Sequence, residues 1–511
     1  MLSKTFSAAV IGVDAFKIDV EVNVQKGGDY ENTSIVGLPD MAVKESKDRI
    51  RSAILSSNLM RIEGNAVVNL APADIKKEGA AFDLAIACAL LAASGQIKLE
   101  RLRRTAILGE LALDGSIRPV KGALPIAAAL AQDAGIDNLI VPNANKNEAA
   151  AGAKAGNLTV YPMNHLLEAV GFCNQNSAEP YVYCENTDDT DLSEELDFCD
   201  IKGQMLAKRA MEIAAAGGHN SLMIGPPGTG KSMTAARINS ILPPMTYAEA
   251  LESSRIYSAL GMLNGQNIMS RRPFRAPHHT ISDVALIGGG KDPRPGEISL
   301  AHNGVLFLDE LPEFKRNVLE VLRQPLECGN IHVSRASGSC VFPADFMLIA
   351  AMNPCPCGYG DAELGCKCKV DEKRRYRKKV SGPLLDRIDL HIELRQLSQD
   401  ELLRAPDGEK SAVIRERVIA ARAIQSARFA GSKVHCNAQM TSRQLQQFCQ
   451  LDRGSVMLLR QAISQMKLSP RAYDRILKVS RTIADLAHSE KITENHLFEA
   501  IQYRKSGIGD E

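Results

Sequence analysis

Strand-like and helical patterns alternate along the first part of the chain. Apolar residues with a period of two predict strands, and apolar positions three and four apart predict helices. The expected strands are residues 18–24, 66–70, 106–113 and 139–141, and the expected helices are residues 40–57, 81–93 and 123–132. This order of elements is typical of α/β domains. We therefore predict an α/β domain over residues 1–170.

The middle of the chain contains short apolar runs that predict a second, parallel sheet. These runs are residues 222–224, 305–308, 346–351 and 384–390. The first three have the nearly continuous apolar composition of strands that are buried on both faces. The fourth is expected to be a strand that carries Arg387 near its start.

The last part of the chain follows helical periodicity from about residue 397, for example at Leu458, Leu459, Ile463 and Met466. Residues 185–197 contain seven acidic residues and few apolar ones, which predicts a flexible linker. The predicted divisions are an N-terminal α/β domain (1–170), an acidic linker (171–197), an α/β core (198–396) and a helical lid domain (397–511).

A glycine-rich loop follows the apolar run at 222–224 and precedes a helix that is expected to reach about residue 241. Glycine lets a backbone direct its N–H groups at phosphate, Lys231 adds a positive charge, and the Ser232 hydroxyl can bind Mg²⁺. A simple glycine-rich turn is the alternative, although every fixed position of the phosphate-binding pattern is present. The predicted nucleotide-binding residues are Gly225, Pro226, Pro227, Gly228, Thr229, Gly230, Lys231 and Ser232.

Two acidic residues, Asp309 and Glu310, follow the run at 305–308 directly. A buried parallel strand would deliver them to the carboxyl edge of the sheet, beside the glycine-rich loop. We predict that Asp309 holds Mg²⁺ together with Ser232, and that Glu310 polarises the attacking water. The two motifs together indicate hydrolysis of a nucleoside triphosphate, with ATP and Mg²⁺ as cofactors.

Two further polar residues lie near the ends of predicted strands. Asn353 follows the run at 346–351 and is expected to position water or the γ-phosphate. Arg387 is a candidate arginine finger that reaches the nucleotide of a neighbouring subunit. A local salt bridge of Arg387 with Asp386 or Asp389 is equally compatible with the sequence.

Four of the twelve cysteines gather in a loop after Asn353. Cys355, Cys357, Cys366 and Cys368 form the pattern C-x-C-x8-C-x-C, and four thiolates this close can hold a tetrahedral Zn²⁺. The spacing is tighter than the common C-x2-C pattern, so reduced thiols without a metal are the alternative. Twelve cysteines in 511 residues do not indicate a disulfide scaffold.

Composition narrows the possible partners. The formal net charge is only +1, so binding of nucleic acid would depend on local patches. The longest apolar stretch, residues 84–93, is too short to span a bilayer, and the first residues lack the pattern of a signal peptide. We expect a soluble cytoplasmic protein with no membrane partner.

Beyond single motifs, the sequence resembles AAA+ ATPases of the magnesium-chelatase-like branch, and in detail the ComM/YifB family of bacterial proteins. The segments that carry the resemblance are residues 34–40, 217–220, 271–280, 296–310, 351–358 and 381–389. They are spread over essentially the whole chain. The resemblance implies an AAA+ core with a helical lid, assembled as a homo-hexamer with nucleotide sites between subunits.

The family resemblance also implies roles and an activity. By similarity, Asn353 is the first sensor, Arg387 the arginine finger in trans, and Arg471 the second sensor on the lid. The implied activity is ATP-driven helicase and branch-migration action on single-stranded and branched DNA during natural transformation. Recombination proteins would be further partners.

Two segments are candidates for contact with DNA. Residues 373–379 contain six cations and one aromatic residue, which suits phosphate binding and base stacking, although a solvated helix face or a contact between subunits explains them equally well. Residues 331–342 predict a hairpin with its turn at 336–338. In related rings such a hairpin projects into the central pore. The candidate DNA residues are Arg335, Ser337, Lys373, Arg374 and Arg375.

The N-terminal part resembles the Lon-protease-like (S5-type) α/β domain but lacks its catalytic dyad. Ala81 stands where the serine nucleophile is expected, and Leu124 where the lysine base is expected. Without a hydroxyl and an amine the covalent route is absent. We expect a ring-forming or DNA-guiding scaffold. Lys76, Lys77 and Lys121 could face DNA, although an ordinary solvated surface is the favoured interpretation of each.

Four classes of function are compared on these grounds. A DNA motor is the prediction. An ATP-driven protein-remodelling machine, magnesium-chelatase-like or chaperone-like, is the alternative and would hydrolyse ATP independently of DNA. A module that uses nucleotide only to assemble a ring fits poorly, because Glu310 and Arg387 are both present. A working protease is the least favoured class, given Ala81 and Leu124.

Overall fold

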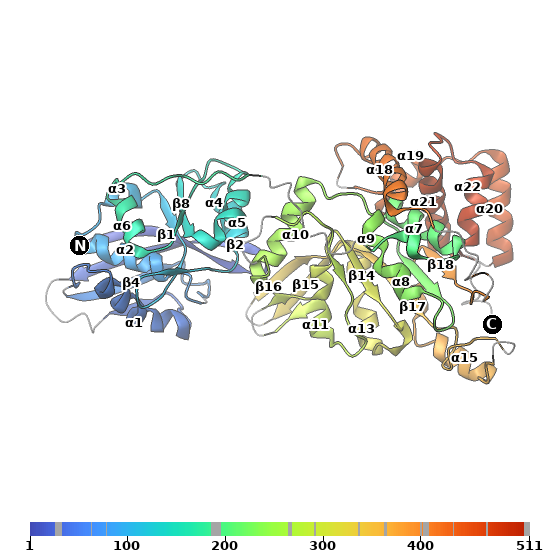
Figure 1. Ribbon diagram of the computed structural model, residues 1–511, viewed down its shortest axis with the longest axis horizontal. Helices are drawn as coiled ribbons and strands as arrows, with labels where there is room; N and C mark the ends of the chain where they lie inside the picture. Colours follow the sequence, from blue (N-terminus) through green and yellow to red (C-terminus); the bar gives the residue numbers. More distant parts are fainter. Residues whose placement is uncertain are drawn as a thin grey trace.

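The computed structural model combines two large sheets with a C-terminal group of helices, and these three parts follow one another along its longest axis (Figure 1). It describes residues 1–25, 33–62, 64–77, 79–184, 196–263, 268–290, 293–335, 338–361, 365–398, 401, 408–432, 434–466 and 469–504. The mixed α/β architecture with a C-terminal helical region confirms the predicted fold class.

The N-terminal sheet has seven strands in the order β3-β4-β2-β1-β5-β8-β9. The strands are β1 (Leu2–Ile11), β2 (Asp14–Gln25), β3 (Ser34–Val36), β4 (Asn65–Ala71), β5 (Thr105–Ile107), β8 (Asn138–Pro142) and β9 (Thr159–Met163). Strand β2 runs antiparallel to both β1 and β4, whereas β5, β8 and β9 continue parallel to β1. The two faces of the sheet are covered by separate apolar clusters.

The helices of this part are α1 (Met41–Ser56), α2 (Asp83–Ala93), α3 (Leu99–Leu102), α4 (Ala123–Leu130), α5 (Lys146–Ala153) and α6 (Leu166–Cys173). Helix α1 begins after Asp40, whose carboxylate accepts a hydrogen bond from the Val43 N–H at 2.8 Å. Helix α2 is buried along its whole length, as expected for a helix that is apolar all round.

The prediction of one continuous strand over residues 106–113 is wrong. It divides into β5 and a two-residue strand, β6 (Glu110–Leu111), which pairs with β7 (Ile117–Arg118). Gly109 separates the two strands with a φ of 157°, and a side chain there would meet Ile117 and Leu84. The run is therefore interrupted where the chain passes close to α2.

Part of the segment predicted as a linker lies against the N-terminal sheet. Helix α6 continues to Cys173, Tyr181 forms a bridge to Val160 of β9, and the Tyr181 hydroxyl donates to Asn147 at 2.6 Å. Tyr183 is buried. Residues 185–195, with most of the acidic residues, lie outside the described part of the chain.

The core sheet has five parallel strands in the order β11-β14-β17-β10-β18. They are β10 (Ser221–Ile224), β11 (Phe274–Arg275), β14 (Val305–Leu308), β17 (Met347–Met352) and β18 (Leu390–Glu393). The runs predicted at 222–224, 305–308 and 346–351 are confirmed as strands. Strand β10, which leads into the glycine-rich loop, lies between β17 and β18.

The strand expected at residues 384–390 is wrong. Residues Gly382–Leu385 form a short helix, α16, with Pro383 in its first turn, and Arg387 lies in the turn before β18. Proline fixes a backbone angle that suits the start of a helix, and this preference determines the local structure.

The other elements of the core are α7 (Met205–Gly217), α8 (Lys231–Ala236), α9 (Ile238–Ile241), α10 (Tyr247–Leu260), α11 (Asp283–Ile287), α12 (Glu297–Leu300), α13 (Arg316–Val321), α14 (Pro325–Cys328), α15 (Val370–Arg377), and the pairs β12 (Gly288–Gly289) with β13 (Arg294–Pro295) and β15 (Asn330–Arg335) with β16 (Gly338–Pro343). The pairing of β15 with β16 confirms the predicted hairpin. Its turn, which includes Ser337, and the side chain of Arg335 lie outside the described residues.

The N-terminal part contacts the core through α10 and the hairpin. The Ser258 hydroxyl of α10 donates to Glu148 at 2.7 Å and accepts the Leu124 N–H at 3.3 Å. Gly12, in the β1–β2 turn, lies against Phe342 of β16, and Val13 joins the apolar cluster that contains this residue. The N-terminal sheet therefore rests directly on the base of the hairpin.

The helical lid, as we name α18–α22, shares one apolar cluster with α7 and one face of the core sheet. Its helices are α18 (Ser411–Arg428), α19 (Ser442–Phe448), α20 (Arg453–Met466), α21 (Pro470–Leu486) and α22 (Glu494–Gln502). Within the part of the chain that the structure describes, no helix combines the length and apolar character needed to cross a membrane.

A buried ion pair joins the lid to the core. Asp389, which is 3% exposed, lies just before β18 and pairs with Arg475 of α21. Its second carboxylate oxygen is 3.2 Å from His219 Nδ1, and His219 Nε2 is 2.8 Å from the Thr482 hydroxyl. Although burial alone would raise the pKa of Asp389, Arg475 and His219 hold it well below its usual value.

We expect Arg475→Met to lower the free energy of unfolding of the core and lid by about 3 kcal/mol at pH 7, because it leaves a buried carboxylate without its partner. The pKa of Asp389 is lowered on folding, so its stabilising contribution is complete above the unfolded pKa and is lost only as the pH falls toward the folded value. Urea titration at pH 7 measures the free energy of unfolding of the wild-type and variant proteins. The control is Arg453→Met, an exposed position in the lid, and equal stability of the two variants would contradict the expectation.

Candidate active site

The glycine-rich loop joins β10 to α8 and requires glycine at several positions. Gly228 and Gly230 have φ angles of 76° and 86°, in the left-handed region that favours glycine. At Gly225 an added Cβ would lie 2.6 Å from the carbonyl oxygen of Leu394. The loop therefore keeps its shape only with glycine at these three positions.

The Lys231 side chain points into this loop. Its ammonium group donates to the carbonyl oxygens of Gly225 at 2.7 Å and Pro226 at 2.8 Å, and to Asn353 Oδ1 at 3.2 Å. Burial lowers the pKa of Lys231, and the charges of Asp309 and Glu310 oppose this shift. All three hydrogen-bond partners are neutral oxygens, so the positive charge fits an anionic ligand such as phosphate.

Ser232 and Asp309 meet at the same edge of the sheet. The Ser232 hydroxyl donates to Asp309 Oδ2 at 2.6 Å, and the Glu310 N–H donates to Asp309 Oδ1 at 2.9 Å. A hydroxyl and a carboxylate are oxygen ligands of the kind that Mg²⁺ prefers. The two residues that the sequence assigns to Mg²⁺ are thus adjacent, and their chemistry fits the ion.

Glu310 has a partner that the sequence did not reveal. His279 Nδ1 lies 3.3 Å from its carboxylate, and the rings of His278 and His279 are 4.1 Å apart. Strand β11 ends at Arg275, so both histidines lie in the segment that follows the strand. The segment 271–280 therefore lies partly in the sheet and partly beside the acidic pair.

Helix α15 packs beside the site through its one buried residue, Tyr376. Burial, together with the carboxylates of Glu313 and Glu310, raises the pKa of Tyr376 to about 12, and a hydrogen bond with the Asn353 backbone opposes the shift. The two ends of the segment from Asn353 to α15 thus meet near the nucleotide loop.

The two candidate arginines lie together. Arg387 is 4% exposed and pairs with Glu327 of α14, while Arg471 Nη2 is 3.6 Å from the same carboxylate. Among the described residues the ion pair of Arg387 is with Glu327 and not with Asp386 or Asp389, and Asp389 pairs with Arg475 instead. The local sequence around Arg387 does not indicate a contact between the turn before β18 and α14.

The four cysteines converge. Their sulfur atoms all lie within 4.8 Å of one another, with Cys355 to Cys357 at 3.2 Å, Cys355 to Cys366 at 3.7 Å and Cys357 to Cys366 at 3.5 Å.

The cations expected to contact DNA have different environments. Arg374 and Arg375 of α15 are exposed, whereas Lys373 is half-buried and donates to the Gly360 carbonyl at 2.5 Å. In the N-terminal part Lys76 and Lys121 are exposed, but Lys77 is fully buried and bonds to the Pro72 carbonyl. Burial lowers its pKa. The expectation that Lys77 is solvated is therefore wrong.

Three family models match successive parts of the chain. The model described as magnesium chelatase, subunit ChlI, matches residues 197–402. The model for subunit ChlI of Mg-chelatase matches residues 20–145, and that for the C-terminal part of subunit ChlI matches residues 408–504.

Similar proteins align over nearly the full length. The competence protein ComM of Haemophilus influenzae is 45% identical over 508 residues, which are 98% of this chain and 97% of that protein. The YifB protein of Escherichia coli is 43% identical over 504 residues, with the same coverage of 98% and 97%. The chain belongs to the ComM/YifB family of magnesium-chelatase-like AAA+ ATPases. A magnesium-chelatase 67 kDa subunit of Chlorobaculum tepidum is 28% identical over 159 residues, which are 31% of this chain and 23% of that protein. Membership of the family implies ATP hydrolysis with Mg²⁺.

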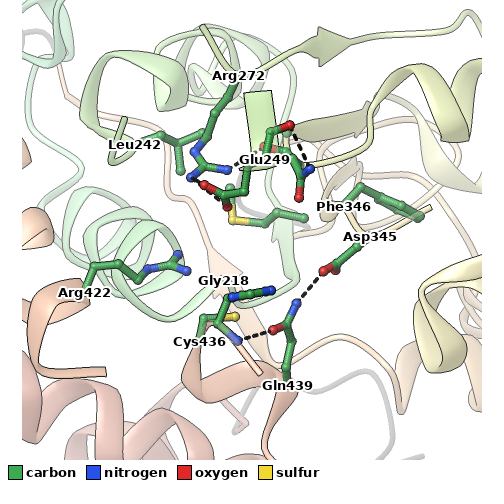
Figure 2. A pocket seen from close by; sticks show the side chains of 13 residues that line it. Gly218, Leu242, Glu249, Arg272, Asp345, Phe346, Arg422, Cys436 and Gln439 are labelled. Atoms are coloured by element: carbon green, nitrogen blue, oxygen red, sulfur yellow. Dashed lines mark hydrogen bonds and ion pairs between the residues drawn. The ribbon is translucent and has the colours of Figure 1, made fainter. Parts of the chain in front are cut away.

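Some residues that carry the ComM/YifB resemblance lie away from the nucleotide loop. A small pocket opens where β14 and β17 begin, at the sheet edge opposite the loop, and Figure 2 shows Arg272 and Glu249 pointing toward one another in its wall. Arg272 also donates to the Asn303 carbonyl at 2.7 Å. At Gly218 a side chain would meet the Cys436 sulfur of the lid at 2.7 Å. Gly218 and Arg272 thus pack the core and its junction with the lid.

Ala81 and Leu124, the positions at which a Lon-type dyad was expected, carry no reactive group. The Leu124 side chain is fully buried in α4, and its N–H bonds to Ser258 of the core. Leu124 thus takes part in the contact between the N-terminal sheet and the core.

We expect Lys231→Ala to abolish ATP hydrolysis, because the buried positive charge of the loop is lost. Glu310→Gln should lower kcat by about 10²–10⁴-fold, the usual contribution of a general base, while nucleotide still binds. Phosphate release and the binding of a fluorescent ATP analogue measure the two effects. Glu313→Gln, a nearby carboxylate bonded to Lys379, is the control and should hydrolyse ATP at close to the wild-type rate. Normal turnover by Glu310→Gln would contradict its role.

Proposed function

We propose that this protein is an ATP-hydrolysing motor that assembles as a homo-hexamer and moves along DNA, as a helicase and branch-migration factor in recombination during natural transformation. The proposal rests on one site that contains Lys231, Ser232, Asp309 and Asn353. The chain that carries this site is 45% identical to a competence protein. Such a motor would work in the cytoplasm, on single-stranded and branched DNA and beside other recombination proteins.

The roles of the residues follow from their positions. ATP supplies the phosphoryl group when bound, and the loop from Gly225 to Ser232 would hold its phosphates. Ser232 and Asp309 would hold Mg²⁺. Glu310 would orient the attacking water, with His279 holding its carboxylate, and Asn353 would monitor the phosphate from the neighbouring strand.

Arg387 and Arg471 are proposed to act on the nucleotide of a neighbouring subunit. Within the described residues neither arginine has a hydrogen bond or ion pair with Lys231, Ser232 or Asp309. Both instead reach Glu327, so a phosphate that one arginine contacts lies close to the other. Negative charge brought by a partner's ATP would compete with Glu327 for both guanidinium groups.

The proposed DNA contacts are helix α15 and the β15–β16 hairpin. Arg374 and Arg375 are exposed on α15, whose Tyr376 lies near Asn353, so a cation that binds phosphate would be close to the nucleotide sensor. The hairpin tip, with Arg335 and Ser337, is the second proposed contact. The N-terminal Lon-like part, without a dyad, would act as a scaffold for the ring or a guide for DNA.

A protein-remodelling machine is the second candidate. The similarity of 159 residues to a magnesium-chelatase subunit favours it, since the shared part belongs to the same kind of ATPase. This candidate requires that DNA leave the ATPase rate unchanged, and the two proposals can therefore be separated in solution.

Strand displacement tests the DNA motor directly. With ATP and low salt, purified protein should release the labelled strand of a forked DNA, and Lys231→Ala should release none, because translocation needs hydrolysis. A gel assay records the released strand and a phosphate assay the turnover. Turnover that DNA does not change, without strand release, would contradict the DNA motor and favour protein remodelling.

Mixing two inactive variants tests whether Arg387 acts in trans. We expect Lys231→Ala and Arg387→Ala to hydrolyse little ATP alone and to recover activity when mixed, because a loop from one variant can meet an arginine from the other. In an equal mixture about one interface in four is complete by random assembly. Mixing Lys231→Ala with Glu310→Gln is the control and should recover nothing, since both changes affect the same side of the interface. No recovery in the first mixture would place Arg387 in its own subunit's site.

A further inference from the structure

The loop between β17 and α15 contains a cluster of cysteines that ATP hydrolysis does not use. Cys355, Cys357, Cys366 and Cys368 come from two short segments, and all four sulfur atoms meet. The closest pair is 3.2 Å apart, well beyond the roughly 2.05 Å of a disulfide. The four thiols converge on a common centre and are not joined in pairs.

The spacing of the sulfur atoms fits a single tetrahedral ion. A zinc–sulfur distance of about 2.3 Å places the corners of a tetrahedron about 3.8 Å apart. Three pairs of sulfur atoms lie 3.2, 3.5 and 3.7 Å apart, and every pair lies within 4.8 Å. An iron–sulfur cluster distributes its four thiolates over several iron atoms and so spreads them more widely.

We propose that Cys355, Cys357, Cys366 and Cys368 bind one structural Zn²⁺. Four protein ligands leave no open position on the ion, so the site would stabilise the fold and would not activate water. Each thiol that binds releases its proton to solvent, no electron is transferred, and the site with four thiolates carries a formal charge of −2. Among the residues that the structure describes, no second group of histidines, cysteines and acids brings its ligand atoms together in this way.

The backbone of the loop is arranged for this cluster. Gly358, Gly360 and Gly365 have φ angles of 94°, 76° and 90°, which turn the chain between the cysteine pairs. The Gly360 N–H donates to the Cys355 sulfur at 3.2 Å, as is common around thiolate ligands. Lys373 donates to the Gly360 carbonyl and brings a positive charge to the loop.

The position of the cluster indicates what the ion would hold. A side chain at Gly358 would lie 2.8 Å from Pro227 of the nucleotide loop, so the cysteine loop packs directly on it. Cys355 follows Asn353 by two residues, and Cys368 precedes the start of α15 by two. A Zn²⁺ at this point would fix α15 relative to both the nucleotide loop and Asn353. This role rests on the proposed function of those residues, whereas the binding of zinc does not.

Metal analysis of the full-length protein tests the inference. We expect one zinc per chain in wild-type protein and background zinc in a Cys366→Ser, Cys368→Ser variant, because two of the four ligands are lost. The matched control replaces two exposed cysteines outside the cluster, Cys184→Ser and Cys328→Ser, and should retain the full zinc content. Wild-type protein that stays free of zinc after incubation with Zn²⁺, or that contains iron instead, would overturn the proposal.

A second measurement uses wild-type protein, so its result does not depend on whether the variants fold. Wild-type protein stripped of metal and titrated with Co²⁺ should develop the visible absorption bands of tetrahedral thiolate coordination, saturating at one Co²⁺ per chain. Metal-free protein should also be cleaved faster by protease between residues 355 and 369, since the loop loses its cross-link. Absence of the bands in the titrated wild-type protein would overturn the site whatever the ATPase or DNA activity. If zinc binds and strand displacement fails, only the proposed function is lost.

Discussion

The ion pair between Asp389 and Arg475 is the contact on which the arrangement of the two candidate arginines, Arg387 and Arg471, depends. Asp389 lies two residues after Arg387, and Arg475 lies one helical turn after Arg471. A buried carboxylate without a cation beside it is costly, so Arg475 cannot withdraw while Asp389 stays buried without a loss of free energy. The pair therefore fixes both arginines around Glu327, on the side of the core proposed to face a neighbour.

The nucleotide site was predictable from sequence because short-range rules and sheet topology both apply to it. Parallel strands end at one edge, so residues after β10, β14 and β17 must meet there, although 122 positions separate Lys231 from Asn353. The same argument placed Asp309 beside Ser232. The seven-stranded N-terminal sheet was predictable as an α/β unit, but its strand order was not, since periodicity does not specify which strands are neighbours.

The errors arise where a distant partner determines a residue's environment. Lys77 looks like a surface residue in sequence and is buried, because its backbone pairs with the segment at Pro39 and Asp40. Glu310 lies beside His279 because β11 ends early, and Arg387 lies beside Glu327 because the turn before β18 meets α14. No periodic pattern or motif in the sequence indicates any of these contacts.

The packing of Gly12 and Val13 against Phe342 has a mechanical consequence. The β1–β2 turn of the N-terminal sheet packs against the base of the β15–β16 hairpin, which belongs to the core. Packed interiors resist compression, so a rotation of the first sheet cannot be absorbed at this point and is transmitted to the hairpin. A change in the angle of the N-terminal sheet would therefore shift the base of the hairpin as well.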